Sequence, residues 1–192
     1  NMSGLESNPG FNLNLNVLMR AVYGAIFGDI LMKCVYRMRP YEITPGSVNE
    51  LHEKWNEKCR QFISRKYLSF ATFKRMCRQM IAEFDSIPIQ EDRKPRVGIV
   101  GEILVKFLPA ANNYLAELLE AEGAEAVCPD LLDFMFYCFY NQIYKSGQFG
   151  TSKKTAYACK AGIAAMNFAR GAATKAFIKS KHFDPPANIY DL

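Results

Sequence analysis

The stretch from residue 96 to residue 134 constrains the fold more than any other part of this chain. An apolar run, Val97–Val100, ends at Gly101-Glu102, a helical pattern follows from about Asn113 to Gly123, and a second short apolar run covers residues 125–127. Strand, helix and strand in this order predict two parallel strands joined by a crossover. Ligands of open parallel sheets bind at the carboxyl ends of strands, so we expect the main pocket between Gly101-Glu102 and the start of the helix.

Long helical patterns surround this β-α-β unit. Apolar residues recur every three or four positions over residues 13–38, 47–66, 69–85, 131–144 and 153–179. Ser47 with Glu50 three residues later predicts a capping box at the start of the second helix. The glycine-bracketed residues 146–150 predict a turn before the last helix. The expected fold class is therefore α/β and helix-rich, a small parallel sheet covered by several long helices.

Composition divides the chain into four segments. We expect a flexible leader over residues 1–12, a helical region over 13–85, a polar, proline-flanked linker over 86–95, and an α/β region with a long C-terminal helix over 96–192. These segments are expected to form one compact unit. A sheet of two strands is small beside the average of about five strands, so we expect the chain to be a piece of a larger protein.

The spacing of cysteines and histidines does not match the common metal-site motifs. The six cysteines lie far apart, there is no C-x-x-C pair, and the chain has only two histidines. Zinc fingers and ferredoxin-type cluster motifs need closely spaced thiolates, so neither is expected. Scattered cysteines on apolar faces are typical of reduced, buried thiols, which favours a cytoplasmic protein.

The most apolar helix carries charges that disfavour a membrane span. Residues 17–35 include Arg20, Asp29 and Lys33, and a buried amphipathic helix explains that pattern better than a bilayer would. No basic segment precedes a compact apolar run with a cleavage site, as a signal peptide would require. We therefore expect no membrane partner and a cytoplasmic location.

Basic residues concentrate at the C-terminal end. Residues 151–183 contain seven lysines and arginines and no acidic residue, within a chain of net charge +5. Such a stretch can bind phosphate groups or nucleic acid. A solvated helix face is the favoured interpretation, because no nucleic-acid-binding motif accompanies the charges. Nucleic acid is therefore not an expected partner.

Few residues near the predicted strand ends are candidates for binding or catalysis. Gly98 and Gly101 lack the third glycine of a dinucleotide-binding motif, so nucleotide binding through this turn is not expected. Glu102 is a candidate acid, base or hydrogen-bond acceptor, or else a carboxylate satisfied by nearby backbone amides. Asn112 and Asn113 are expected to cap the following helix, and their side chains can also face the crevice.

A second polar cluster follows the first long helix. Arg39-Pro40-Tyr41-Glu42 places a cation, a rigid turn, a phenol and a carboxylate in four residues. This cluster either binds an anionic ligand or joins the helical region to the sheet, and joining is the favoured interpretation. No serine-histidine-acid or metal-ligand pattern is recognisable, so no catalytic residue and no metal ligand is nominated.

Several short motifs occur together in a fixed order. They are Asp29-Ile30-Leu31, Arg39-Pro40-Tyr41-Glu42 with Gly46, Val100-Gly101-Glu102-Ile103, Asn112-Asn113 and Glu122-Gly123-Ala124-Glu125. In this combination the chain resembles the CoA-substrate-specific enzyme activases, large proteins of 2-hydroxyacyl-CoA dehydratase systems. The resemblance covers roughly residues 15–184, and the RPYE and GE motifs in this order are moderately specific. In that family an ATP-binding, actin-like activase region precedes a region similar to the dehydratase subunits, and this chain resembles the second region.

The resemblance implies an association with radical dehydration of 2-hydroxyacyl-CoA, in which ATP hydrolysis drives an electron between iron-sulfur clusters. The implied partners are other domains of the same polypeptide and an acyl-CoA, and the implied cofactors of the full-length protein are an iron-sulfur cluster and ATP. The ligand-binding candidates carried over are Arg39, Tyr41, Glu42, Gly101, Glu102, Asn112 and Asn113.

The chain departs from the family pattern in ways that bear on activity. It has no phosphate-binding loop, no pair of bridging cysteines and no Pro-Phe-Gly-Cys segment. We therefore expect a domain that binds no cofactor alone and is inactive in isolation. Two alternatives stay open: a dehydratase-like enzyme component whose cluster ligands lie outside this chain, and a phosphate- or nucleic-acid-binding module that uses the basic C-terminal helix.

Overall fold

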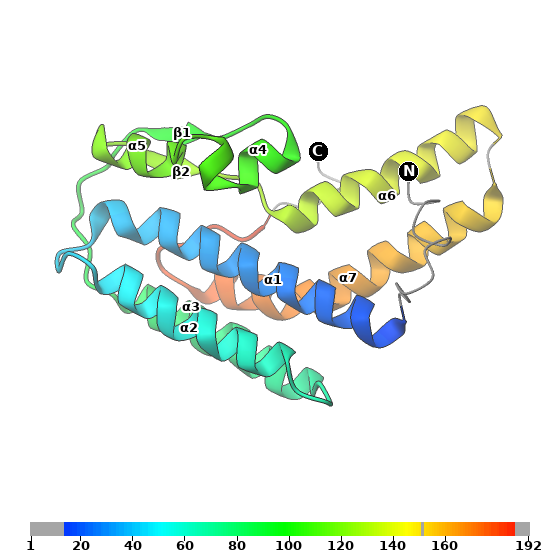
Figure 1. Cartoon of the computed structure of the whole chain (residues 1–192), viewed down its shortest axis with the longest axis horizontal. Coiled ribbons are helices and arrows are strands. Elements are labelled where there is room, and N and C mark those ends of the chain that lie inside the picture. The colour runs from blue at the N-terminus through cyan, green and yellow to red at the C-terminus, as the bar shows by residue number, and fades with distance from the viewer. Residues whose placement is uncertain (1–13, 151, 187–192) are drawn as a thin grey trace.

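The computed structural model describes residues 14–150 and 152–186, and Figure 1 shows their arrangement. The long helices are α1 (Leu15–Met38), α2 (Ser47–Ile63), α3 (Phe70–Asp85), α6 (Leu131–Phe149) and α7 (Lys153–Lys179). The β-α-β unit consists of β1 (Arg96–Gly98), α4 (Ile103–Phe107), η3 (Pro109–Ala111), α5 (Leu115–Ala121) and β2 (Glu125–Val127). The predicted helix-rich α/β fold with a small parallel sheet is confirmed. The expected leader, residues 1–12, lies outside the described residues.

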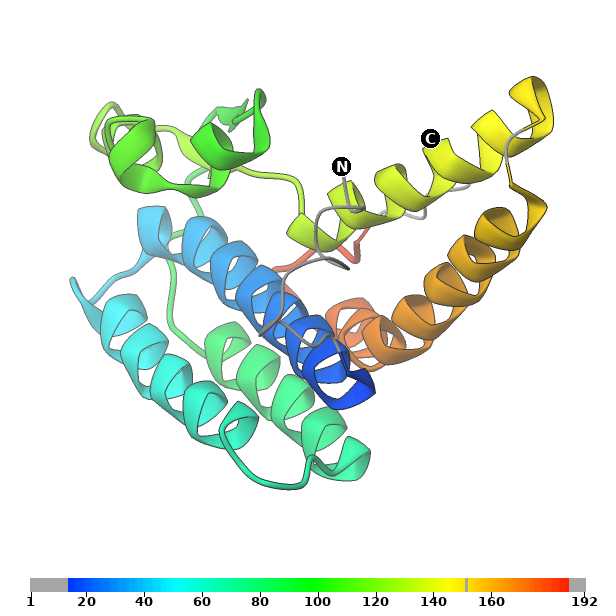
Figure 2. The same ribbon diagram turned by 45° about the vertical axis from the view of Figure 1, so that its right-hand side comes forward.

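Helix α1 is the centre of the molecule. In Figure 2 it lies between the α2–α3 pair and the hairpin of α6 and α7, with the β-α-β unit alongside its C-terminal half. Its buried side chains, including Phe27, Ile30 and Cys34, belong to one core that α2, α3, α6 and α7 share. Tyr23 of α1 stacks on Phe73 of α3 with ring centroids 4.1 Å apart. Apolar burial of this extent is the main source of stability for the helical body.

Length and composition alone would also allow the α1 region to cross a membrane. Within the described part of the chain, Leu15–Tyr41 is the one stretch that meets those two criteria. The core helix of a soluble protein meets them as well, and α1 contributes a buried face to the core described above.

The sheet is parallel and pairs Arg96 with Glu125, Val97 with Ala126 and Gly98 with Val127. A second, smaller core cluster lies under it and includes Ile99, Ala116 and Cys128. Met32 and Tyr36 of α1 pack against this cluster, so the β-α-β unit rests on the C-terminal half of α1. The unit is thus fixed to the helical body by apolar contact as well as by the polar contacts described below.

The crossover is more broken than the sequence predicts. The helix expected from Asn113 begins at Leu115, because Asn113 and Tyr114 both have positive φ values, 57° and 54°. Two unpredicted short helices, α4 and η3, fill the preceding residues, and Pro109 stands at the start of η3. The first strand ends at Gly98, so Val100 lies outside the sheet.

Two helix boundaries also differ from expectation. Helix α2 ends at Ile63 instead of near residue 66, and α6 continues through the expected turn to Phe149. Gly150, with a φ of 64°, ends α6 in the left-handed conformation that glycine adopts readily. The expected capping box at Ser47 is wrong, because Gly46 is the N-cap residue and another carboxylate caps the helix.

Candidate functional site

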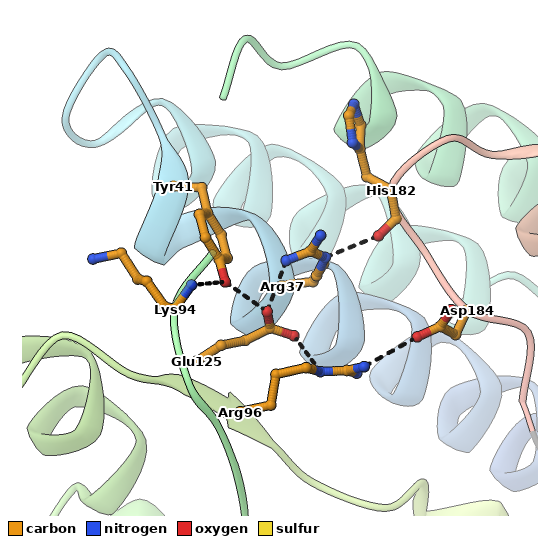
Figure 3. A network of polar contacts seen from close by, with 7 residues as sticks. All are labelled: Arg37, Tyr41, Lys94, Arg96, Glu125, His182 and Asp184. Carbon is orange, nitrogen blue, oxygen red and sulfur yellow. Dashed lines mark hydrogen bonds and ion pairs between the residues drawn. The ribbon is translucent and has the colours of Figure 1, made fainter. Parts of the chain in front are cut away.

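The carboxylate of Glu125 lies at the centre of a polar network between α1 and the sheet (Figure 3). Its Oε2 accepts hydrogen bonds from Arg37 Nη1 at 2.7 Å and from the Tyr41 hydroxyl at 2.9 Å. Its Oε1 pairs with Arg96 Nε at 3.0 Å. Glu125 is only 2% exposed, so this charge is buried and is compensated by two arginines.

The same network reaches two further segments. Arg37 Nε donates to the His182 carbonyl at 2.9 Å, and the Tyr41 hydroxyl accepts from the Lys94 amide at 3.2 Å. One cluster therefore ties together the end of α1, the linker before β1, the strand β2 and the segment after α7. Its geometry is that of a structural junction, because each polar atom named here contacts protein.

Arg39 makes a second connection to the β-α-β unit. Its Nε and Nη2 donate to the two carboxylate oxygens of Glu120 on α5, at 2.6 and 2.9 Å, and its Nη2 lies 3.8 Å from Glu117. A guanidinium that holds a carboxylate in this two-point manner has fixed geometry. The joining role predicted for the Arg39-Pro40-Tyr41-Glu42 cluster is thus confirmed at Arg39.

Glu42 does not make that connection. Its carboxylate accepts hydrogen bonds from the Gly46 amide at 2.8 Å, the Val48 amide at 2.9 Å and the Ser47 hydroxyl at 3.1 Å. It therefore caps the N-terminus of α2, where the free amides and the helix dipole favour a negative charge. Within the RPYE motif, Arg39 and Tyr41 thus contact the β-α-β unit, whereas Glu42 caps a helix.

The residues of the GE and Asn-Asn motifs are also used locally. Glu102 accepts from the Leu104 and Val105 amides and caps α4. Asn112 accepts from the Leu115 amide and donates to the Val105 carbonyl at 3.0 Å, which holds α4 to α5. Asn113 is exposed.

The main pocket was predicted between Gly101-Glu102 and the start of the following helix. Gly101 has a φ of 131° and lies exposed beside Glu102. Three hollows on the described residues lie between α1, α2 and the β-α-β unit, between α3 and α7, and beneath α6, and none of these three is lined by Gly101, Glu102, Asn112 or Asn113. Helices α4 and η3 occupy the residues that were expected to form an open turn, and a pocket at Gly101-Glu102 stays a prediction.

Sequence analysis missed a buried cluster of acids beneath α6. Asp29 of α1 accepts from the Leu131 and Leu132 amides at 2.7 and 3.0 Å, and so caps α6 from a distant helix. Asp130 pairs with the buried Arg170 of α7 at 2.7 Å, and Lys33 lies 3.7 Å from its other oxygen. The signal in the sequence was a carboxylate within an apolar helix, which needs a partner when it is buried.

This cluster shifts the pKa values of its acids. Burial, and then repulsion from Asp130, raises the pKa of Asp29 from 3.8 to about 7. Burial also raises the pKa of Asp130, although Lys33 and Arg170 oppose that change. The cavity beside these groups has a volume of about 10 Å³, which is the space of roughly one water molecule.

A groove of about 640 Å³ between α1, α2 and the β-α-β unit is the candidate small-molecule site. Its floor includes Gly24 and Gly28 of α1, and its rim carries polar side chains such as Arg39 and His52. An added Cβ at Gly28 would meet no atom within 4 Å, so the groove is open at that point. Arg39 is the one sequence-predicted candidate that lines it, with a guanidinium already paired to Glu120.

The cysteines do not converge on a metal site in the described part of the chain. No group of three or more histidine, cysteine or acidic side chains is placed to hold a metal ion there. Cys34, Cys59 and Cys77 are buried in the helical core, as predicted. Burial raises the pKa of the Cys128 thiol to about 11, so this group at the end of β2 is protonated at neutral pH.

No protein-family model matches this chain, and the comparisons with curated proteins and with solved structures likewise found no match.

Proposed function

We propose that this chain is a module of a CoA-substrate-specific enzyme activase, or of a related 2-hydroxyacyl-CoA dehydratase protein, and that it is not catalytic alone. The observation that supports the proposal is the use of the motif residues. Arg39 and Tyr41 join α1 and the residues after it to the β-α-β unit. Glu42 and Glu102 cap helices. Side chains committed to such contacts are not available as general acids, bases or metal ligands.

The chemistry of the implied cofactors supports the same view. A cubane iron-sulfur cluster requires several converging thiolates, and ATP hydrolysis requires a phosphate cradle with carboxylates for magnesium. Among the described residues the thiols lie apart, and burial raises the pKa of Cys59 to about 12. These residues do not fit a cluster, so within the proposal the cofactors belong to other parts of the full-length protein.

The native product of the gene tests this proposal. An antibody raised against this chain would isolate that product from the source cells without oxygen. We expect a polypeptide longer than these 192 residues that contains iron and hydrolyses ATP when a low-potential reductant is supplied. A native product of this length, without iron and without ATP turnover in its complexes, would contradict the proposal.

The groove of about 640 Å³ between α1, α2 and the β-α-β unit favours a second candidate function, binding of an acyl-CoA by a dehydratase-like component. Its volume lies within the range of small-molecule sites, and its floor is apolar with a polar rim. Calorimetric titration with acetyl-CoA, and with a longer acyl-CoA, tests this function. The Gly28→Phe variant should abolish the heat of binding, because the new ring would fill the groove. Equal binding by the variant would reject this site.

A further inference from the structure

A second groove, of about 750 Å³, runs along the surface between α3 and α7. Its floor is formed by small or apolar residues, among them Ile81, Ala172 and Ala176. Phe70 of α3 and Phe168 of α7 stack with centroids 5.0 Å apart at one end. Toward the other end lies Ile178, which is 64% exposed. The groove is therefore a long apolar trough that continues onto exposed apolar side chains.

Both sides of the trough carry cations. Lys74 and Arg78 lie on the α3 side, and Lys175 and Lys179 lie on the α7 side. Among the described residues, none of these four side chains forms an ion pair with a carboxylate. The positive charge along the trough is thus not neutralised from within the described protein.

The one acidic residue that lines the trough, Asp85, already accepts hydrogen bonds from the backbone. Both oxygens of Asp85 accept from the Lys181 amide at 3.0 Å, and one of them also accepts from the His182 amide. Helix α7 has no acidic residue at all. An occupant with negative charge would therefore meet four cations that form no ion pair within the described residues, and no carboxylate without hydrogen-bond partners.

The dimensions match a helix. From Phe168 to Lys179 the trough follows α7 for about 16 Å, which is three helical turns. The floor presents Gly171 and two alanines, and a Cβ at Gly171 would meet no atom within 4 Å. Small residues of this kind let a neighbouring helix approach closely. Apolar grooves of other proteins bind the apolar face of an amphipathic helix.

We propose that the α3–α7 groove is a docking site for an acidic amphipathic helix of a partner protein. The apolar face of that helix lies on the trough floor between α3 and α7. Its carboxylates, flanking this face, pair with Lys74, Arg78, Lys175 and Lys179. This inference does not depend on the proposed function.

The shape of the site distinguishes this partner from other anionic surfaces. A bilayer is flat and cannot enter a trough bounded by two helices. A nucleic acid presents phosphates that bind lysines and arginines, but its charged backbone would gain nothing from contact with an apolar floor. Moreover, Arg170, which belongs to the same basic stretch of sequence, is buried against Asp130 and Asp133 and cannot reach a phosphate chain.

A designed peptide tests the site directly. The probe is a fluorescein-labelled helix of about 16 residues with leucines on one face and glutamates on both flanks, and its partner probe has glutamine at every glutamate. Fluorescence anisotropy measures binding to the full chain from about 50 to about 300 mM salt. We expect the acidic probe to bind and the glutamine probe to bind at least about tenfold more weakly at low salt.

Matched variants distinguish binding in the groove from nonspecific electrostatic attraction between the acidic probe and the protein. The double variant Lys175→Glu with Lys179→Glu should bind the acidic probe about tenfold more weakly, or weaker still. Lys153→Glu with Lys154→Glu changes the net charge equally but lies about 30 Å away along α7, and should change binding less than about threefold. Gly171→Phe keeps all charges and fills the trough, so it should also abolish binding.

Folding and competing occupants are checked in the same series. Circular dichroism melting curves verify that each variant folds, and Lys175→Gln with Lys179→Gln is a milder replacement should the reversal unfold the chain. Equal weakening by the two lysine pairs, or unchanged binding by Gly171→Phe, would overturn the proposal. Tighter binding of oligothymidylate, or of phosphatidylserine-containing vesicles, with the same dependence on Lys175 and Lys179 would also overturn it.

Discussion

Arg39 and Glu120 form a two-point ion pair across 81 residues of sequence, with hydrogen bonds of 2.6 and 2.9 Å. The pair joins the residue that follows α1 to the short helix α5 of the β-α-β unit. It is half-buried, with side-chain exposures of 19% for Arg39 and 12% for Glu120. Water therefore screens it less than a surface ion pair, and its loss leaves a poorly solvated carboxylate.

Replacement of Arg39 tests that contact. Arg39→Ala should lower the free energy of unfolding by about 1–3 kcal/mol, because Glu120 loses both hydrogen bonds. Urea unfolding measures the change. Arg60→Ala, which removes an exposed ion pair with Glu57, is the control and should cost less than about 0.5 kcal/mol. An unfolding midpoint unchanged by Arg39→Ala would leave Arg39 free for ligand binding.

Glu42 and Glu50 allow two capping models for α2 to be compared. Glu42→Ala should destabilise the protein by about 1–2 kcal/mol, because the Gly46 and Val48 amides lose their acceptor. Glu50→Ala should cost less than about 0.5 kcal/mol, since Glu50 is exposed and no capping box forms. Thermal melts in parallel give both values, and the reverse order would restore the capping-box model.

The raised pKa of Asp29 predicts an unusual pH dependence. The folded protein holds this proton more tightly than the unfolded chain, so the contribution of Asp29 to the free energy of unfolding is largest below about pH 4. It falls as the pH rises to about 7, by at most about 4 kcal/mol. Carbon-13 NMR titration of the Asp29 carboxyl measures the pKa, and a midpoint near 4 would disprove this prediction.

A substitution isolates the same effect. Asp29→Asn keeps one acceptor for the Leu131 amide and removes the titrating group. Stability of this variant should fall less between pH 4 and pH 7 than that of the original chain. Asp92→Asn, at an exposed position in the linker, is the control and should keep the original slope.

Helix positions were the most predictable part of the fold. The boundaries of α7 and of β2 agree with the sequence pattern, because apolar periodicity there coincides with buried faces. The crossover between β1 and β2 was less predictable. Its path depends on single backbone conformations, at Asn113 and Tyr114, and on local caps at Glu102 and Asn112, which periodicity does not encode.

The roles of the polar motif residues were only partly predictable. The adjacency of Arg39 and Tyr41 to a helix end favoured a joining role, but their partners, Glu120 and Glu125, lie more than 80 residues away. No local spacing links such residues. The partners of Asp29 could not be predicted either. They are backbone amides of α6, and every helix start has such amides whatever its side chains are.

Under the proposed function this chain is inactive when it is alone, and cofactor loading tests that proposal. Anaerobic incubation with iron, sulfide and reductant, followed by gel filtration, metal analysis and a phosphate-release assay with ATP, measures both activities at once. We predict iron far below one equivalent per chain and phosphate release equal to a protein-free blank, because the described thiols do not converge. Near-stoichiometric iron with visible charge-transfer absorption, or ATP turnover above the blank, would show that the isolated chain does hold a cofactor or an activity.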